Sequence, residues 1–189
     1  MFWGHENIKG LKSTTIKDYW QWTYSDLLIE SNRSSLGLFI IAHALELTKM
    51  PRINWGNVDL RYKRKKISVD ICSRIQGWKQ SKSNRILFNI SRKKGIHAKN
   101  DRSLTFKNRE ADLYILGLHK EKDLKNADFL NLEQWDFYVV LTKVLDDNFP
   151  TKNKIGIRLL NSIAEPIQFK DIQRKVNDLI ENKSNDLAE

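Results

Sequence analysis

The sequence predicts an α/β protein in which one central mixed β-sheet is flanked by helices. Two observations lead to this prediction. Helical spacing of apolar residues occurs near both ends of the chain, whereas strand patterns occupy its middle. In addition, Ala111–Leu118 and Trp135–Leu141 are continuous apolar runs, as is typical of strands covered on both faces. The 189 residues suit one domain, with a core over about 14–182 and a polar tail over 183–189.

Two helices are expected first. Thr14 or Thr15 is a candidate N-cap for a helix over Ile16–Ile29. Its apolar residues recur at helical spacing and predict one buried face made by Ile16, Tyr19, Trp20, Tyr24, Leu27 and Leu28. The next helix, Arg33–Leu47, is apolar almost all round, so we expect it to lie centrally, buried beside the sheet.

The strands of the sheet come next. Val58–Tyr62 and Ile67–Cys72 read as a hairpin with a basic turn, and Arg85–Ile90 reads as a third strand of the same sheet. Ser91–Arg109 is polar and long for a loop, which is typical of functional or mobile segments. After the two apolar runs we expect a short helix, a short strand and two further helices, at Thr142–Leu145, Ile155–Ile157, Arg158–Ala164 and Lys170–Ile180.

The positive charge is concentrated in the middle of the chain. The net charge is +10, but Arg61–Lys125 holds 19 Lys and Arg against 6 Asp and Glu, a local balance of +13. The remaining residues hold 14 basic and 17 acidic side chains. Aromatic and histidine rings lie among these cations, at Trp78, Phe88, His97 and Phe106. This pattern favours a nucleic-acid partner, although Phe88 lies in an apolar run and suits the core, and a merely basic surface is the alternative.

Several classes of protein are disfavoured. No apolar run reaches the ~18 residues of a membrane span, and the N-terminus lacks the pattern of a secretory signal. The single cysteine, Cys72, fits a reducing compartment, so we expect a cytoplasmic protein, with this thiol as a small buried apolar group. Phosphate-binding glycine motifs and the common zinc motifs do not occur, so we expect no nucleotide cofactor and no zinc site.

The hairpin carries the most informative pattern of polar residues. Asp59 lies on its first strand. On the second strand side chains alternate between faces, which puts Lys66, Ser68, Asp70 and Cys72 on one face and Ile67, Val69 and Ile71 on the other. Two carboxylates on paired strands can hold a divalent metal ion, and a nearby lysine can position the attacking water. The pattern therefore indicates phosphodiester hydrolysis as a candidate chemistry.

Several blocks of the chain also resemble a known family. The two most specific are READLYILGL at Arg109–Leu118 and LNLEQWDFYVVLTKVLDD at Leu130–Asp147. Further blocks are DYWQWTYSDLL at Asp18–Leu28, NRSSLGLFIIAHAL at Asn32–Leu45, VDL at Val58–Leu60 and ISVDICSRIQGW at Ile67–Trp78. Together they resemble a small bacterial branch of the PD-(D/E)XK nucleases over about Asp18–Ile180. The resemblance implies a restriction-endonuclease-like fold.

The catalytic pattern of that family is incomplete in this chain. The family has a glutamate on the apolar helix, where this chain has Leu38, whereas the first-strand aspartate matches Asp59. The family's Glu-x-Lys on the second strand aligns with Ser68 and Asp70 without a gap, or with Asp70 and Cys72 across a two-residue gap. In both alignments the lysine is missing. Lys66 has the strand parity to replace it in a rearranged centre.

Three functions follow from this reading. The first is a protein that binds double-stranded DNA through a nuclease-like fold with a degenerate catalytic centre and no cofactor. The second is a Mg²⁺-dependent endodeoxyribonuclease in which Asp59 and Asp70 hold the metal and Lys66 replaces the lost lysine. The third is a non-catalytic partner subunit of a restriction or phage-defence system. Relatives of this fold often act as dimers, so a homodimer is a further expected assembly.

The expected DNA contacts follow the basic segments. We expect phosphate contacts that give salt-dependent affinity and little sequence reading. Gln76 and Trp78 are candidates for shaping the cleft, with Trp78 equally suited to the core. The expected phosphate-binding side chains are Lys63, Arg64, Lys65, Lys66, Lys79, Lys82, Arg92, Lys93 and Lys94.

Overall fold

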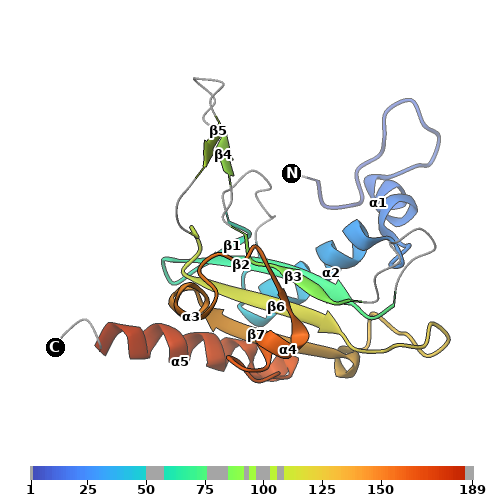
Figure 1. The fold of residues 1–189 in the computed structure, drawn as a ribbon. Helices are drawn as coiled ribbons and strands as arrows, with labels where there is room; N and C mark the ends of the chain where they lie inside the picture. Colours follow the sequence, from blue (N-terminus) through green and yellow to red (C-terminus); the bar gives the residue numbers. More distant parts are fainter. Residues whose placement is uncertain are drawn as a thin grey trace.

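A four-stranded mixed sheet forms the centre of the computed structural model, which describes residues 2–49, 58–75, 85–91, 94–96, 103–105 and 109–185. Its strand order is β1-β2-β6-β7, with bounds Leu60–Tyr62, Lys65–Ser73, Leu113–His119 and Trp135–Leu141. The central strands β2 and β6 are parallel, and both outer pairs are antiparallel. With helices on the sheet (Figure 1), this confirms the predicted mixed sheet flanked by helices.

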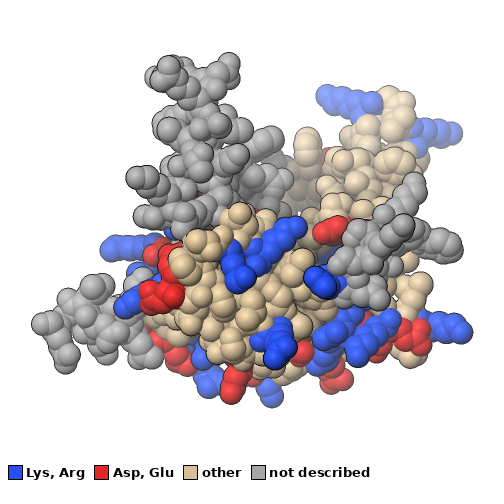
Figure 2. Space-filling model, viewed as in Figure 1, with Lys and Arg blue, Asp and Glu red and all other residues tan. Residues whose placement is uncertain are grey.

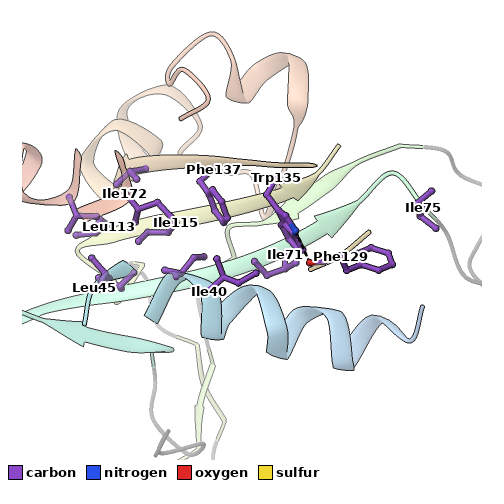
Figure 3. Packing of buried hydrophobic residues seen from close by; sticks show 14 residues of the cluster. Ile40, Leu45, Ile71, Ile75, Leu113, Ile115, Phe129, Trp135, Phe137 and Ile172 are labelled. Atoms are coloured by element: carbon purple, nitrogen blue, oxygen red, sulfur yellow. Dashed lines mark hydrogen bonds between the residues drawn. The ribbon is translucent and has the colours of Figure 1, made fainter. Parts of the chain in front are cut away.

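One face of the sheet is covered by α2 (Glu30–Ala44) and α5 (Ile172–Asn185). Ile40 of α2, Leu45 directly after it and Ile172 of α5 pack in a core completed by strand residues such as Phe137, as Figure 3 shows. At its edge the indole N–H of Trp135 donates to the carbonyl of Phe129 at 3.1 Å. The indole is fully buried, and this bond satisfies its polar atom.

The opposite face packs against a smaller layer. Strands β3 (Leu87–Asn89) and β8 (Lys154–Gly156) form an antiparallel pair, accompanied by α3 (Thr142–Asn148) and α4 (Ile157–Leu160). A second buried cluster lies here, including Phe88, Tyr114, Leu116, Tyr138 and Leu160. Because both faces are covered, all seven residues of β6 are buried. The two continuous apolar runs are therefore strands, as predicted.

Two strand predictions are corrected. The segment Arg85–Ile90 does not join the central sheet, because β3 pairs instead with β8 across Leu87–Gly156, Phe88–Ile155 and Asn89–Lys154. The expected long loop after it contains a short antiparallel pair, β4 (Lys94–Ile96) with β5 (Ser103–Thr105). Short 3₁₀ turns lie at Leu132–Gln134 and Phe169–Asp171. No helix in the described ranges is long and apolar enough to cross a membrane.

The helix predictions also need correction. Thr15 caps α1 (Ile16–Tyr24) in a reciprocal capping box with Asp18, so the predicted start is right. The helix ends five residues early, where the side chain of Asn32 donates to the carbonyls of Thr23 and Asp26. The part of its predicted buried face that lies on α1 is not buried. Leu27 and Leu28, which follow the helix, are partly buried against the core.

Helix α2 is central but not apolar all round in its contacts. It begins three residues before the predicted start and ends three before the predicted end. Leu38, Ile40 and Ile41 are buried as expected, but the Phe39 side chain is 56% exposed. Only one side of the helix faces the sheet, so a ring on its other side stays in solvent.

Strand β2 approaches its neighbours closely at Ile71. A Cβ placed on Gly117 of β6 would lie 2.7 Å from Cδ1 of Ile71 and 3.4 Å from the Phe137 ring. A Cβ on Gly37 of α2 would lie 2.6 Å from Cδ1 and 2.7 Å from Cγ1 of the same isoleucine. The two glycines therefore make the room in which the Ile71 side chain packs.

Gly117→Ala is expected to lower the free energy of unfolding by about 1–3 kcal/mol, through overpacking against Ile71. Ile71→Val removes Cδ1, the atom that the new Cβ would meet. In the Ile71→Val background, Gly117→Ala should therefore cost much less stability than it does in the wild type. Gly37→Ala is the matched control. Its Cβ would meet a γ-carbon of Ile71 that valine retains, so Ile71→Val should not relieve its cost. Urea unfolding of the two double-mutant cycles measures the coupling. Purely additive effects at Gly117 and Ile71 would contradict this packing account.

A cationic hairpin beside a carboxylate pocket

The turn between β1 and β2 is built from two cations in an unusual backbone conformation. Lys63 and Arg64 have φ values of 46° and 65°. Two-residue hairpin turns of this kind favour Asn-Gly, because both central residues need positive φ, which costs other residues energy. Asn or Gly at these two positions would therefore stabilise the turn more than Lys63 and Arg64 do.

Further cations flank the turn. Arg61 on β1 is directly opposite Lys66 on β2, and Tyr62 is opposite Lys65. Like charges directly opposite each other across a strand pair are destabilising. We call Arg61, Lys63, Arg64, Lys65 and Lys66 the cationic hairpin. Arg61, Lys63 and Arg64 are exposed, and the other two are half-buried.

Part of this charge has a structural role. The ammonium of Lys63 donates to Oδ1 of Asn177 on α5 at 2.8 Å and lies 5.5 Å from the centre of the Tyr62 ring. Strand β1 is also an edge strand, and lysines on edge strands prevent pairing with other chains. One or two cations would be enough for that purpose. Five cations in six positions exceed it, which marks the hairpin as a candidate anion-binding surface.

Asp59 lies just before β1 and completes the edge of β2. Its backbone N–H donates to the carbonyl of Ile67, and its Oδ2 accepts the N–H of Val69 at 2.8 Å and the hydroxyl of Ser68 at 3.2 Å. Since the pairing of β1 with β2 ends at Leu60–Ile67, the carboxylate takes the place of the missing strand for Val69. Asp59 thus has a structural role.

Asp70 is the second carboxylate of the site. Its Oδ2 accepts the backbone N–H of Asn89 on β3 at 2.7 Å. Burial raises the pKa of this carboxyl to about 6, which the Asn89 N–H opposes, and the charges of Asp59 and Glu30 raise it further while Lys154 lowers it. The fold therefore holds Asp70 where its charged form is disfavoured.

The two carboxylates open into one small pocket of about 120 Å³. Helix α2 contributes Ser34, Ser35 and the largely buried Leu38 to its wall. Leu38 thus puts an apolar side chain where the family resemblance expects a glutamate. Glu30 lies two turns earlier on α2, about 12 Å along the helix axis, so it contributes charge and not a ligand at Leu38.

The pocket fits a metal ion only in part. Mg²⁺ is commonly held by one or two carboxylates together with water molecules. Asp59 and Asp70 could provide these carboxylates. In the described part of the chain no group of three or more His, Cys, Asp and Glu side chains is arranged to hold a metal ion. The donor set is therefore smaller than a dedicated metal site would use.

The predicted faces of β2 are found in the structure, and they separate the candidate residues. Ile67 and Ile71 join the core under α2 and α5, whereas Cys72 packs on the opposite cluster. Burial raises the pKa of the Cys72 thiol to about 12, and the charge of Asp70 raises it too, so the thiol stays protonated. The backbone N–H of Lys66 donates to Asp112. Burial is the main cause of the raised pKa of Asp70, and the charge of Lys154 on β8 opposes it weakly.

Sequence reasoning missed Lys154, Asn89 and the two serines. Lys154 and Asn89 are register partners in the β3–β8 pair. They lie 65 residues apart, and no local pattern indicates that this pair packs beside Asp70. Ser34 and Ser35 are the only polar residues in the stretch SSLGLFIIA, and that polarity was the one available signal.

The structure does not place the other predicted DNA contacts relative to this site. Gln76, Trp78, Lys79, Lys82, Arg92 and Lys93 are outside the described residues, and Lys94 is described only in its backbone, within β4. Phe88 is fully buried, as its apolar run suggests. Arg109 is buried and pairs with Asp146, and Lys120 pairs with Asp136 at 3.0 Å, so these two cations stabilise the fold.

No family model, curated protein or solved structure matches this chain. The fold class stated above therefore comes from the structure itself.

Asp70→Asn is expected to stabilise the protein above pH 6 and to leave its stability unchanged near pH 4. Between pH 3.8 and about 6 the unfolded chain releases the Asp70 proton while the folded chain keeps it, so stability falls as pH rises through this window. The loss is up to about 3 kcal/mol. Asparagine cannot ionise, and its carbonyl still accepts the Asn89 N–H. Urea unfolding at pH 4 and pH 7.5 tests this, and a variant less stable than the wild type at pH 7.5 would contradict it.

Proposed function

We propose that this chain binds double-stranded DNA through a restriction-endonuclease-like domain whose catalytic centre is degenerate. The cationic hairpin is the observation that carries the proposal. Its five cations lie in a hairpin whose turn has positive φ at Lys63 and Arg64, and whose strands hold a directly opposed like-charge pair. Both features cost folding energy. A phosphate backbone that binds there would offset this repulsion.

The same surface explains how such binding would behave. Neutralising phosphates releases condensed counterions from DNA, so affinity falls as salt rises. Phosphate contacts fix the position of the duplex and read little sequence. Arg61 and Arg64 are both exposed, and the arginine fork suits phosphate oxygens. The proposal is therefore one of salt-dependent binding with weak sequence preference.

The pocket supports a degenerate centre. The Asp59 carboxylate accepts two hydrogen bonds that complete the edge of β2, and Leu38 forms the apolar wall. The restriction-endonuclease-like part of the proposal is supported by the quoted sequence blocks and by a mixed sheet with a parallel central pair. When several groups act together in catalysis, removing one of them usually lowers the rate by several powers of ten. The loss of the family's glutamate and lysine therefore favours a centre without activity.

Arg61→Gln/Arg64→Gln is expected to weaken duplex binding without unfolding the protein. Two lost phosphate contacts should lower the slope of log affinity against log salt by about 1.8 and reduce the affinity by about tenfold or more. The same change removes the like-charge pair with Lys66, so the free energy of unfolding should rise by roughly 0.2–1 kcal/mol. Fluorescence anisotropy with a random-sequence duplex at several salt concentrations, combined with urea unfolding, measures both effects.

Lys122→Gln/Lys125→Gln is the matched control. It removes the same charge from exposed residues that follow the far end of β6, at the other end of the sheet from the hairpin. Its effect should be small, since charges beyond the Debye length of about 10 Å are largely screened. Equal effects of the two double variants, or no binding by the wild type at low salt, would overturn the proposal.

A second candidate function is a Mg²⁺-dependent endodeoxyribonuclease, favoured by the position of Lys154 in the fold. Lys154 on β8 is the register partner of Asn89, whose backbone N–H donates to Asp70, whereas the family pattern places the lysine on β2. Asp59 and Asp70 would hold the metal, which would supply Lewis-acid stabilisation of the phosphate when bound. Lys154, and not the predicted Lys66, would then be the catalytic cation.

Incubation of supercoiled plasmid with Mg²⁺ or Mn²⁺ separates the two functions. The DNA-binding proposal predicts intact plasmid. Cleavage that is lost in both Asp70→Asn and Lys154→Gln, but retained in Lys66→Gln, would establish the nuclease instead. Cleavage that persists in Asp59→Ala would identify a contaminating enzyme and would not count against DNA binding.

A further inference from the structure

A second pocket lies at the C-terminal end of α2, away from the two carboxylates. It has a volume of about 390 Å³, and we call it the α2-end pocket. Its walls come from the end of α2, the segment that follows and the 3₁₀ turn Phe169–Asp171. Pockets for small ligands measure roughly 300–1,000 Å³, so this one suits a single small planar group. The lining residues are His43, Ala44, Glu46, Thr48, Lys49 and Phe169.

Three rings form a row at this pocket. The rings of Phe39 and His43 are stacked with their centroids 6.1 Å apart. Those of His43 and Phe169 are stacked at 6.4 Å, with an angle of 14° between their planes. Phe39 and His43 are exposed, and Phe169 is half-buried. Proteins that bind single-stranded nucleic acid stack unpaired bases on aromatic and histidine rings, because every base has a π-face.

Glu46 occupies a backbone position that favours glycine. It follows α2 with φ 59°, in the left-handed region where a side chain is costly. Its N–H donates to the carbonyl of His43, and the N–H of Leu47 donates to that of Ala42, which is the pattern of a glycine-type helix end. Glycine would stabilise this helix end more, yet the chain has an exposed carboxylate there, beside the rings. A residue held at such a position is a candidate functional group.

A carboxylate beside stacked rings selects among the bases. Its two oxygens only accept hydrogen bonds. The Watson–Crick edge of guanine carries two adjacent donors, N1–H and N2–H₂, whereas each of the other bases has one donor group there beside acceptors. This edge is accessible only in an unpaired base. Guanine therefore matches Glu46 best, and Lys49, which also lines the pocket, supplies a cation for the adjoining phosphate.

Helix α5 links this pocket to the cationic hairpin. The Gln173 side chain donates to Glu46 at 3.4 Å, and Asn177 accepts the ammonium of Lys63 at 2.8 Å. Gln173 and Asn177 are four residues apart on α5, so they lie on the same side of the helix, about 6 Å apart. Figure 2 shows cations on the left of the molecule, where the β1–β2 turn lies in Figure 1. A strand held at the hairpin therefore reaches the pocket within a few nucleotides.

We propose that the α2-end pocket binds an unpaired guanine of the DNA whose backbone lies on the cationic hairpin. The base stacks on His43 and Phe169, and the Glu46 carboxylate accepts hydrogen bonds from its N1–H and N2–H₂. This site rests on the proposed DNA binding and deepens it. It narrows the ligand to a duplex with a single-stranded end or junction that contains guanine.

Fluorescence anisotropy with three labelled duplexes tests the guanine site. One duplex is blunt, and the other two carry a short thymine overhang with or without one guanine. The wild type should bind the guanine overhang roughly 5- to 150-fold more tightly than the thymine overhang, the range of a good bidentate base contact. His43→Ala should weaken binding of the guanine overhang at least about fivefold, through lost stacking, and leave binding of the blunt duplex unchanged.

Glu46→Gly separates a ligand contact from a structural role. Because glycine suits φ 59°, this variant should unfold at a higher urea concentration than the wild type, yet bind the guanine and thymine overhangs equally. Glu181→Gln is the matched control, since it removes one negative charge from an exposed residue of α5 one turn beyond Asn177. It should keep the guanine preference. A Glu46→Gly variant that also keeps it would overturn the role of this carboxylate.

Titration with 2′-deoxyguanosine 5′-monophosphate distinguishes failure of this site from failure of the hairpin. The imidazole proton signals of His43, assigned by their loss in His43→Ala, should shift with this nucleotide and much less with thymidine 5′-monophosphate. Equal binding of the three duplexes by the wild type would overturn the guanine site and leave DNA binding by the hairpin standing. If no duplex binds at low salt, DNA binding is overturned, and the guanine site stands or falls with the imidazole shifts.

Discussion

Strand β2 is paired unequally on its two edges, and this constraint determines the site. Along one edge seven of its residues pair with β6, which is buried throughout. Along the other edge only three of its residues, Lys65–Ile67, pair with β1. The backbone groups beyond that point still need hydrogen-bond partners, because burying an unsatisfied N–H is costly. Asp59 meets that need for Val69, so a carboxylate at this edge follows from the shortness of β1.

Disfavoured negative charge and excess positive charge lie close together along this edge. Asp70 is half-buried, and its negative charge is disfavoured there by loss of solvent and by the charges of Asp59 and Glu30. A few residues away along the same two strands lie the five cations of the hairpin. The carboxylate that completes the strand edge is partly engaged by protein donors, whereas the exposed arginines of the hairpin remain accessible to a ligand. This distribution favours holding a phosphate backbone over hydrolysing it.

The sequence predicted the parts of this structure that depend on local pattern. The apolar run in β6, the bounds of β7, the hairpin and the alternating faces of β2 all follow from the periodicity of side chains. It failed where distant segments decide the outcome. The same spacing that predicts a buried face on α1 also suits a helix whose apolar face lies outside the fold, and only the tertiary structure distinguishes them. The pairing of Lys154 with Asn89, whose N–H donates to Asp70, depends on contacts across 65 residues.

Hydrogen exchange of the β1–β2 hairpin tests the central claim most directly. Amide exchange would be followed by mass spectrometry at low salt, with and without a random-sequence duplex. If the hairpin cations hold the phosphate backbone, exchange over residues 60–66 should slow when the duplex is added, since the bound ligand offsets the repulsion that loosens this turn. Unchanged exchange in the hairpin, with slowing confined to other segments, would contradict the claim and place the DNA contacts elsewhere.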